Sequence, residues 1–462
     1  MLFSSISFLY YFLPIVLVVY FAVPFKAKNL VLLLFSLIFY FYGGPNYLIL
    51  LVASALVGWG FGLLIDRFRG RTGGKVFLCL SLISSLGVLG VFKYADFAIG
   101  NFNAVFGASL PLSGLVLPIG ISFYTFQIMS YTIDVYRGDA RVQKNPLTLL
   151  TYVALFPQLI AGPIVRYSTI EGELEKRTHS FGNAAYGAQR FVLGLAKKVL
   201  IANALGEFCA LFRQTNEPSV LFYWLYAIAF SLQIYFDFSG YSDMAIGLGR
   251  IFGFHFLENF NYPFISKSIT EFWRRWHISL GTWFRDYLYI PMGGNRVKKW
   301  RWLVNIAVVW MLTGLWHGAS WNFVLWGAYF AVFLIIEKLF LGKLLERMPK
   351  VVSHLYLIVT VLLSFVLFNA ETLQQCISDI GAMFGAGGIP FVTAQTLYYL
   401  RSYAVLLVVA IVGATPLAKW LVQKVKLDKT FVIAPLALAA LLIVVTAYLV
   451  DGGFNPFLYF RF

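Results

Sequence analysis

Two histidines, His277 and His317, are the residues of this sequence best suited to chemistry in apolar surroundings. His317 lies in a run without charged residues, Trp302 to Ile336, with Gly314 and Gly318 nearby. An ionisable group inside an apolar segment is costly and is a candidate functional group. Neighbouring glycines let a substrate approach the ring, and burial keeps imidazole neutral, the form that a general base requires. The alternative interpretation is a histidine satisfied within a core.

His277 is surrounded by aromatic and basic residues in the sequence WRRWHISL, which begins at Trp273. One interpretation is an interfacial amphipathic helix with tryptophan anchors and snorkelling arginines. The other is a histidine near cations that bind a phosphate-bearing donor such as a CoA thioester, with Arg274, Arg275 and Arg285 as the donor-binding residues. The spacing alone leaves both interpretations open.

The remaining polar residues of interest have structural interpretations. We expect His179, in a charged loop, and His354, at the start of an apolar segment, to be solvated or interfacial, and His255 to pack or cap. Asp237 and Asp243 are expected to form a hydrogen-bonded structural corner with the tyrosines and serines beside them.

Other reaction classes are disfavoured by the motifs that the sequence lacks. It contains no HExxH, no clustered histidine boxes, no GxSxG and no GxxxxGK[ST], which argues against a protease, an oxidase and an ATPase. The three cysteines, Cys79, Cys209 and Cys376, are too far apart to form a CxxC pair. We therefore expect no metal site and no bound cofactor.

The amino-acid composition indicates a membrane protein. Hydrophobic residues make up 60% of the 462 positions and charged residues only 12%, and the mean hydropathy is +0.78. The apolar segments are unbroken rather than alternating with period two, which favours helices over a barrel. The sequence therefore predicts an all-α polytopic membrane protein. Its net charge of +16 comes from cations in short loops, which indicates topology rather than nucleic-acid binding.

The charges predict an orientation and a number of spans. Lys26 and Lys28 follow an uncleaved first span and are expected inside, which places the N-terminus outside. The charge-free run of 35 residues from Trp302 would be a helix of about 50 Å. This exceeds the ~30 Å hydrocarbon core, so the run must turn at His317 to Ser320. We expect about twelve spans, both termini outside, and broken or re-entrant helices between 147 and 253.

Several motifs together resemble the membrane-bound O-acyltransferase (MBOAT) family. The pair WRRWHISL and LTGLWHGASW, each with one histidine, is similar to the paired histidine motifs of that family. Further segments resemble its branch that O-acetylates alginate and related polysaccharides: Phe156 to Arg166, Tyr235 to Met244 and Asn259 to Phe264. The membrane protein of teichoic-acid D-alanyl transfer is a related type.

The resemblance implies a single MBOAT domain, residues 1–462, in the bacterial inner membrane. It implies a helical funnel in which His317 meets a cytoplasmic acyl thioester, acetyl-CoA or another, and an outer acceptor. It also implies an extracytoplasmic serine-hydrolase-like O-acetyltransferase as partner and a polysaccharide as final acceptor. We expect His317 to be the general base and His277 to have a supporting role.

The aromatic C-terminal tail, residues 451–462, is expected to face outside. It is interpreted either as an interfacial anchor or as a docked segment whose Tyr459 carries the acyl group between the thioester and the partner transferase. Two alternatives to acetyl transfer remain open for the whole chain. They are D-alanyl transfer to teichoic acid and a non-enzymatic transporter of a polysaccharide precursor.

Overall fold

Helices dominate the computed structural model, which describes residues 1–160, 162–425, 433–452, 455 and 458. No strand occurs among these residues, so the predicted all-α class is confirmed. Eight of the described helices are long and apolar enough to cross a membrane, which makes the chain a multi-pass membrane protein. The count of twelve spans stays a prediction, because other apolar segments form shorter or more polar helices.

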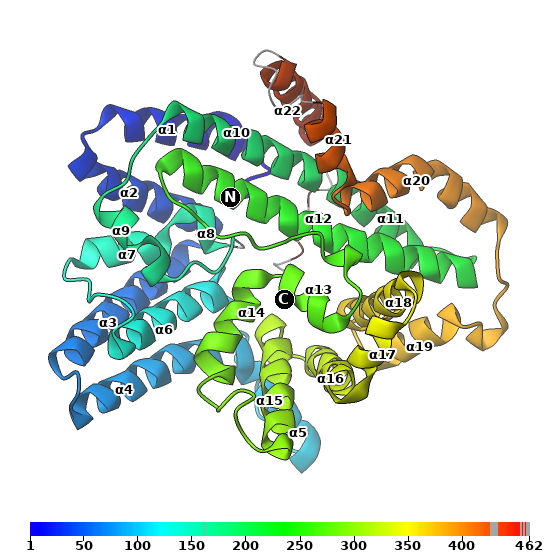
Figure 1. Cartoon of the computed structure of the whole chain (residues 1–462), viewed down its shortest axis with the longest axis horizontal. Coiled ribbons are helices and arrows are strands. Elements are labelled where there is room, and N and C mark those ends of the chain that lie inside the picture. Colours follow the sequence, from blue (N-terminus) through cyan, green and yellow to red (C-terminus); the bar gives the residue numbers. More distant parts are fainter. Residues whose placement is uncertain (161, 426–432, 453–454, 456–457, 459–462) are drawn as a thin grey trace. The chain divides into compact units, whose positions relative to one another are not determined.

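The described chain divides into two compact units, and the division falls inside α10 and α12, two helices that are labelled in Figure 1. The first unit comprises Met1–Phe191 and Tyr241–Leu257. Its helices are α1 (Leu13–Ala22), α2 (Phe25–Gly43), α3 (Leu48–Arg67), α4 (Thr72–Leu89), α5 (Ala95–Phe106), α6 (Ile121–Arg137), α7 (Pro146–Ala154), α8 (Phe156–Leu159), α9 (Tyr167–Glu175), and parts of α10 (Phe181–Ala196) and α12 (Val220–Phe252).

The second unit comprises Val192–Gly240 and Glu258–Phe462 and contains both candidate histidines. It begins with the last residues of α10, which the π-helical turn η4 (Lys197–Asn203) follows, and it includes α12 as far as Gly240. Its other helices are α11 (Ala204–Arg213), α13 (Ile269–Arg275), α14 (Ile278–Phe284), α15 (Lys299–His317), α16 (Trp321–Ile336), the π-helical turn η7 (Glu337–Leu341), α17 (Gly342–Arg347), α18 (Lys350–Asn369), α19 (Leu373–Met383), α20 (Ala394–Gly413), α21 (Leu417–Val425) and α22 (Ile433–Asp451).

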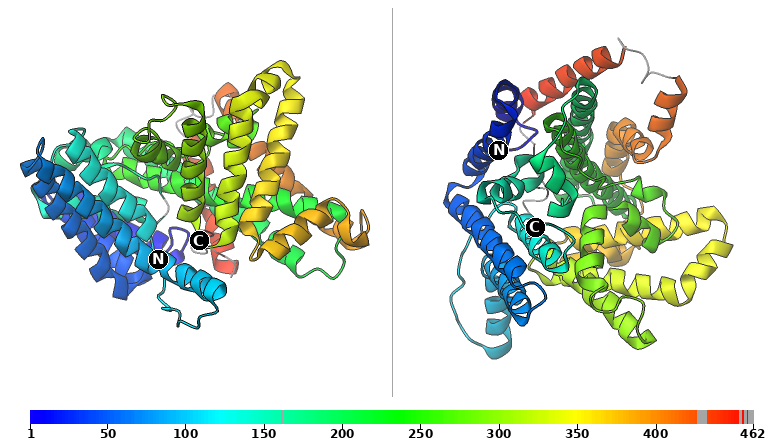
Figure 2. Two further views of the ribbon diagram at one scale, coloured as in Figure 1. Left: turned by 90° about the horizontal axis from the view of Figure 1, so that it is seen from below. Right: turned by 60° about the vertical axis from the view of Figure 1, so that its left-hand side comes forward.

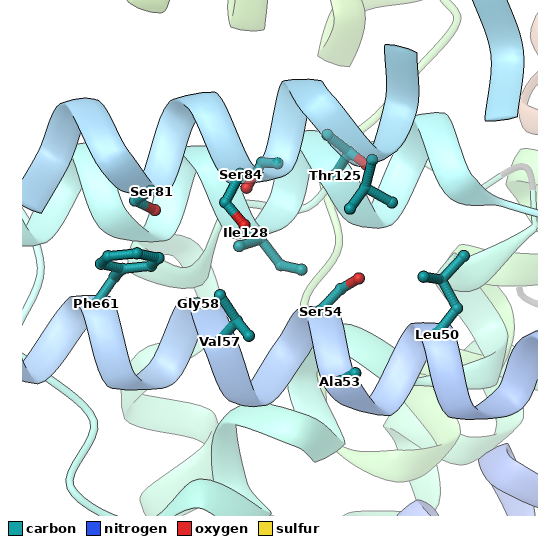
Figure 3. Close-up of a pocket in the computed structure, with 12 residues that line it drawn as sticks. Leu50, Ala53, Ser54, Val57, Gly58, Phe61, Ser81, Ser84, Thr125 and Ile128 are labelled. Carbon is teal, nitrogen blue, oxygen red and sulfur yellow. The ribbon is translucent and has the colours of Figure 1, made fainter. Parts of the chain in front are cut away.

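Helices α3, α4 and α6 pack side by side in the first unit (Figures 1 and 2). Small residues allow this approach: a Cβ atom on Gly58 would lie 2.5 Å from a methyl carbon of Ile128. The three helices border a pocket with several hydroxyl-bearing side chains, among them Ser54, Ser84 and Thr125 (Figure 3). None of the predicted site residues lines this pocket.

The segment that the sequence predicted to be broken consists of short helices. Asn145 caps α7 by accepting a hydrogen bond from the Leu147 amide. α7 and α8 end after nine and four residues, and Pro163 lies in the non-helical stretch that follows. The expectation of broken helices is confirmed here, whereas α12 runs unbroken for 33 residues.

Helices α15 and α16 form a hairpin that confirms the predicted turn of the charge-free run. α15 ends at His317 and α16 begins at Trp321. The two backbones nearly touch, because a Cβ atom on Gly314 would lie 2.1 Å from the Phe323 carbonyl oxygen, and one on Gly327 would lie 2.3 Å from that of Trp310. Such small-residue contacts are typical of helix packing in membranes.

Helix α12 replaces the structural corner that was predicted around Asp237 and Asp243. Both aspartates lie within one continuous helix, so the chain makes no corner here, although both side chains do have structural partners. Asp237 is buried and forms an ion pair with Lys198 of η4, and Asp243 pairs with Arg190 at 2.8 Å. Each acid thus has a basic partner, as expected for carboxylates in an apolar environment.

Candidate active site

His317 occupies the end of α15, where aromatic rings enclose it. Its side chain is 7% exposed. The ring centroids of Trp316, Trp326 and Phe368 lie 5.1, 5.1 and 5.5 Å from that of His317. Gly318 follows in an extended conformation and ends the helix. The imidazole therefore lies between aromatic rings that restrict its orientation and exclude bulk water.

His277 has a left-handed backbone conformation at the junction of α13 and α14. Its φ is +45°, which costs a residue other than glycine about 1–2 kcal/mol. The side chain is 1% exposed. Hydrogen bonds on the following residues hold the junction: the Ile278 amide donates to the Asn259 carbonyl at 3.0 Å, and the Ser279 amide donates to Asn259 Oδ1 at 3.2 Å.

Asn259 also sets the tautomer of His277. The atom that receives the Ser279 amide must be an acceptor, so it is the amide oxygen of Asn259. The same oxygen lies 3.2 Å from His277 Nδ1, so Nδ1 carries the proton and donates it. When the ring is neutral, its other nitrogen, Nε2, carries the lone pair.

The protonation state of His277 follows from its surroundings. Burial, and secondarily the proximity of His317, hold the pKa of His277 well below its ordinary value. The imidazole is therefore neutral at physiological pH. A neutral ring with a fixed Nδ1–H and a lone pair on Nε2 is able to accept a proton or orient a polar substrate group.

The structure brings the two histidines, 40 positions apart in the sequence, to the same tryptophan. The Trp316 ring lies 5.9 Å from the His277 ring and 5.1 Å from the His317 ring. Phe238 of α12 packs edge-on against His277 with a centroid distance of 4.6 Å. The two imidazoles thus share one buried, aromatic site within the second unit.

A buried glutamate that sequence reasoning missed fixes the start of α13. Glu337, 6% exposed, accepts hydrogen bonds from the amide of Thr270 at 2.9 Å and from its hydroxyl at 2.7 Å. It also accepts from the amide of Ile269 and from the hydroxyl of Tyr356. A carboxylate at this position satisfies free helix N–H groups and favours the positive end of the helix dipole.

The tryptophans around His277 are core residues rather than membrane anchors. Trp276 and Trp283 are 4% and 5% exposed. Trp276 stacks on Phe272 at 5.5 Å and contacts Phe365 at 5.3 Å. The interfacial-anchor interpretation is therefore wrong for these two residues, because α13 and α14 are short helices packed into the second unit.

The three candidate donor-binding arginines have different surroundings. Arg275 pairs with Glu271 at 3.0 Å, and Arg285 pairs with the adjacent Asp286 at 2.6 Å. Arg274 is exposed and has no carboxylate partner among the described residues. Of the three guanidinium groups, that of Arg274 is the one available to an anionic ligand.

The other histidines take structural positions. His354 Nδ1 lies 2.9 Å from the carbonyl oxygen of Ser266, and His179 Nε2 lies 2.8 Å from the Tyr20 hydroxyl. His255 is exposed and pairs with Glu173, so its predicted packing role is wrong. Among the described residues, no cluster of His, Cys, Asp or Glu suits a metal ion.

Two described residues of the C-terminal tail enter the second unit, while Tyr459 itself lies outside the described residues. Leu458 is 5% exposed, and its amide donates to Asp237 Oδ2 at 3.2 Å. The side-chain amide of Asn203 donates to Asn455 Oδ1 at 3.2 Å. The aspartate of the buried ion pair thus also binds the tail backbone.

Comparison with known proteins finds related sequences. A family model described as membrane-bound O-acyltransferase matches residues 137–377, which include both histidines. The chain is 43% identical to a probable alginate O-acetylase of Azotobacter vinelandii over 395 residues, 84% of this chain and 79% of the relative. It is 35% identical to a peptidoglycan O-acetyltransferase of Helicobacter pylori, over 84% of this chain and 81% of the relative. A teichoic acid D-alanyltransferase of Bacillus subtilis is 31% identical over 50% of this chain and 61% of the relative.

The contacts of Asn259 lead to a prediction about its influence on turnover. Asn259→Ala should lower acyl transfer about tenfold or more, since leaving buried polar groups unpaired costs about 1–3 kcal/mol. Asn259→Asp keeps the acceptor but adds a negative charge that raises the pKa of His277. If neutral His277 is required, the acidic limb of the pH–rate profile moves to higher pH. Asn261→Ala, at an exposed asparagine two residues on, is the control. An unchanged profile in Asn259→Asp would argue against this role.

Proposed function

The chain belongs to the membrane-bound O-acyltransferase family and is an acyltransferase, and we propose that it moves an acetyl group from a cytoplasmic thioester across the membrane. Two buried imidazoles in contact with the same tryptophan are the observation that supports this most directly. Such a site offers nitrogen bases in surroundings from which water is excluded, where a thioester is protected from hydrolysis.

The proposed final product is an O-acetylated extracytoplasmic polysaccharide. Two O-acetylating relatives, named for alginate and for peptidoglycan, each match over 84% of this chain. The D-alanyltransferase relative matches over about half of it, 50%. We therefore favour acetyl over D-alanyl transfer, with alginate as the leading acceptor. In the proposed scheme a serine-hydrolase-like O-acetyltransferase outside the membrane completes the transfer. The protein is proposed to lie in the inner membrane with both termini outside, the orientation that its charge pattern predicts.

The proposed reaction is general-base catalysis at His317. Its imidazole takes the proton of an acceptor hydroxyl while the hydroxyl oxygen attacks the thioester carbonyl. The C–S bond then breaks, the thiolate leaves and takes up a proton, and the acyl group becomes an oxygen ester. His277, held by Asn259, orients the reacting groups through Nε2. Because both rings are packed among aromatic side chains, neither has to reorganise during the step.

The assignment of the two histidines is tested in proteoliposomes with labelled acetyl-CoA on one face. The wild-type protein should deliver acetyl to an acceptor on the opposite face, which a transporter would not do. His317→Ala should remove measurable transfer, since a positioned base contributes about 10²–10⁴-fold. His277→Asn, which tolerates the left-handed backbone, should give a partial defect.

His255→Ala, a substitution at an exposed histidine of the first unit, is the control. The insertion and folding of the other variants are compared with those of this control. Turnover near the wild-type level in His317→Ala would remove this residue from the mechanism. An equally complete loss in both histidine variants would show that the two roles are not separable as proposed.

The proposed donor-binding role of Arg274 predicts a selective defect in donor binding when this residue is replaced. Arg274→Gln should raise KM for acetyl-CoA about three- to fivefold with little change in kcat, because exposed charge pairs contribute up to about 1 kcal/mol. KM for acetyl-pantetheine, which lacks the nucleotide phosphates, should not change. Arg301→Gln is a matched control at another exposed arginine. Equal effects on both donors, or impaired insertion alone, would favour topology anchoring. Arg275 and Arg285 remain proposed donor-binding residues, although their carboxylate partners make these guanidinium groups less available to an anionic donor.

The proposed carrier is Tyr459, next to the buried Leu458. Its phenol would attack the thioester once a histidine has taken its proton, and the aryl ester would pass the acyl group to the partner transferase. Tyr459→Phe keeps the ring but removes the hydroxyl, and should abolish polysaccharide acetylation. Tyr448→Phe, at an exposed tyrosine of α22, should be fully active. Mass spectrometry should find acetyl on Tyr459 when the partner is absent. Wild-type activity in Tyr459→Phe would leave the anchor interpretation.

A further inference from the structure

Two cations are buried next to each other at the corner of the first unit where α1 meets α2. Lys28 and Arg177 are 8% and 6% exposed. Basic side chains are rarely so buried unless a carboxylate neutralises them. Within the described residues neither side chain contacts a carboxylate, so this corner has uncompensated positive charge.

Arg177 makes all its hydrogen bonds to neutral acceptors. Nε donates to the Tyr20 hydroxyl and to the Phe252 carbonyl, both at 3.0 Å. Nη1 donates to Asn29 Oδ1 at 2.7 Å and to the Glu173 carbonyl at 3.1 Å. Nη2 is buried and has no hydrogen-bond partner in the part of the chain that the structure describes. A charged donor left unpaired in this way is costly and indicates a missing acceptor.

Lys28 likewise lacks a carboxylate partner among the described residues. Its ammonium donates to the Tyr20 carbonyl at 2.6 Å and lies 4.2 Å from the centre of the Tyr20 ring. The carboxylate of Glu173, whose carbonyl accepts from Arg177, is bound by His255, which donates its backbone amide to Glu173 Oε2 at 2.9 Å and places Nδ1 at Oε1. Glu173 therefore does not neutralise either cation.

The pKa of a third group, His179, indicates a positive electrostatic potential at this corner. His179 lies in the loop after α9, with Nε2 2.8 Å from the Tyr20 hydroxyl. Burial, followed by the charges of Lys28 and Arg177, lowers the pKa of His179. The positive field that disfavours a further cation there favours an anion.

The side chains around these cations are those of a membrane interface. The rings of Phe21 and Phe25 lie 5.1 Å from the Lys28 ammonium and 5.5 Å from the Arg177 guanidinium, respectively. They are 48% and 39% exposed, and aromatic residues beside basic ones are typical of the headgroup region. The charge pattern predicts that Lys28 faces the cytoplasm. Anionic phospholipids are concentrated in that leaflet.

We propose that Lys28, Arg177 and His179 bind the phosphate of an anionic phospholipid, whose acyl chains lie along the exposed apolar residues of α1 and α2. A phosphate diester supplies the negative charge and the acceptor oxygens that this corner lacks. A soluble phosphate has the same headgroup chemistry but gains nothing from the neighbouring apolar surface. The exposed phenylalanines therefore favour the lipid.

The test measures lipid binding to the delipidated protein in neutral detergent by native mass spectrometry. Phosphatidylglycerol should bind, whereas diacylglycerol with the same chains should not. Lys28→Met keeps the apolar stem and removes the charge, and should weaken binding about fivefold, the factor that corresponds to about 1 kcal/mol per basic residue. Lys26→Met, at an exposed lysine of the same helix, is the matched control and should bind as the wild type does.

Three results would overturn the proposal. Undiminished phosphatidylglycerol binding in Lys28→Met would exclude a role for that ammonium. An equal loss in Lys26→Met would show general attraction to the basic surface rather than a site. Displacement of the lipid by inorganic phosphate at equal concentration would assign the site to a soluble anion. Arg177 is left unchanged because its hydrogen bonds join several helices of the first unit.

Discussion

Backbone contact between α15 and α16 is the constraint on which the candidate site depends. With Gly314 and Gly327 at the crossing, the two helices approach too closely for any larger side chain. This hairpin presents His317 at its tip, and its second helix continues into η7, where Glu337 holds the start of α13. Since α13 leads directly to His277, one packing interaction positions both imidazoles. A chain that lost this contact would lose the relative placement of its two candidate catalytic groups.

Much of the fold was predictable because the membrane leaves few alternatives. A charge-free run longer than one crossing has to turn, and the only suitable residues, His317 to Ser320, are where α15 and α16 separate. The all-α class followed from unbroken apolar segments in the same way. The candidate histidines were also recognisable in the sequence, since an imidazole in an apolar run is rare and the paired motifs resemble those of a known family.

The groups that hold the histidines were not predictable, because they act over long distances in the sequence. Asn259 was recognised only as part of a motif, and Glu337 follows α16 as one of several charged residues beyond an apolar run. No local pattern pairs either with its partner. The error at Trp276 has a related cause: tryptophan beside arginine is typical of a membrane interface, and only tertiary packing shows that the ring is in a core.

The division of both units into two chain segments has a consequence for biogenesis. The first unit needs Tyr241–Leu257 for completion, yet the ribosome makes Val192–Gly240, which belongs to the second unit, before them. At about 5–20 residues per second, the first unit waits about 3–10 s for its last segment. During this interval Arg190 of α10 has been synthesised, whereas its partner Asp243 of α12 has not. The Arg190–Asp243 ion pair, and with it the complete first unit, can therefore form only after α12 has been made.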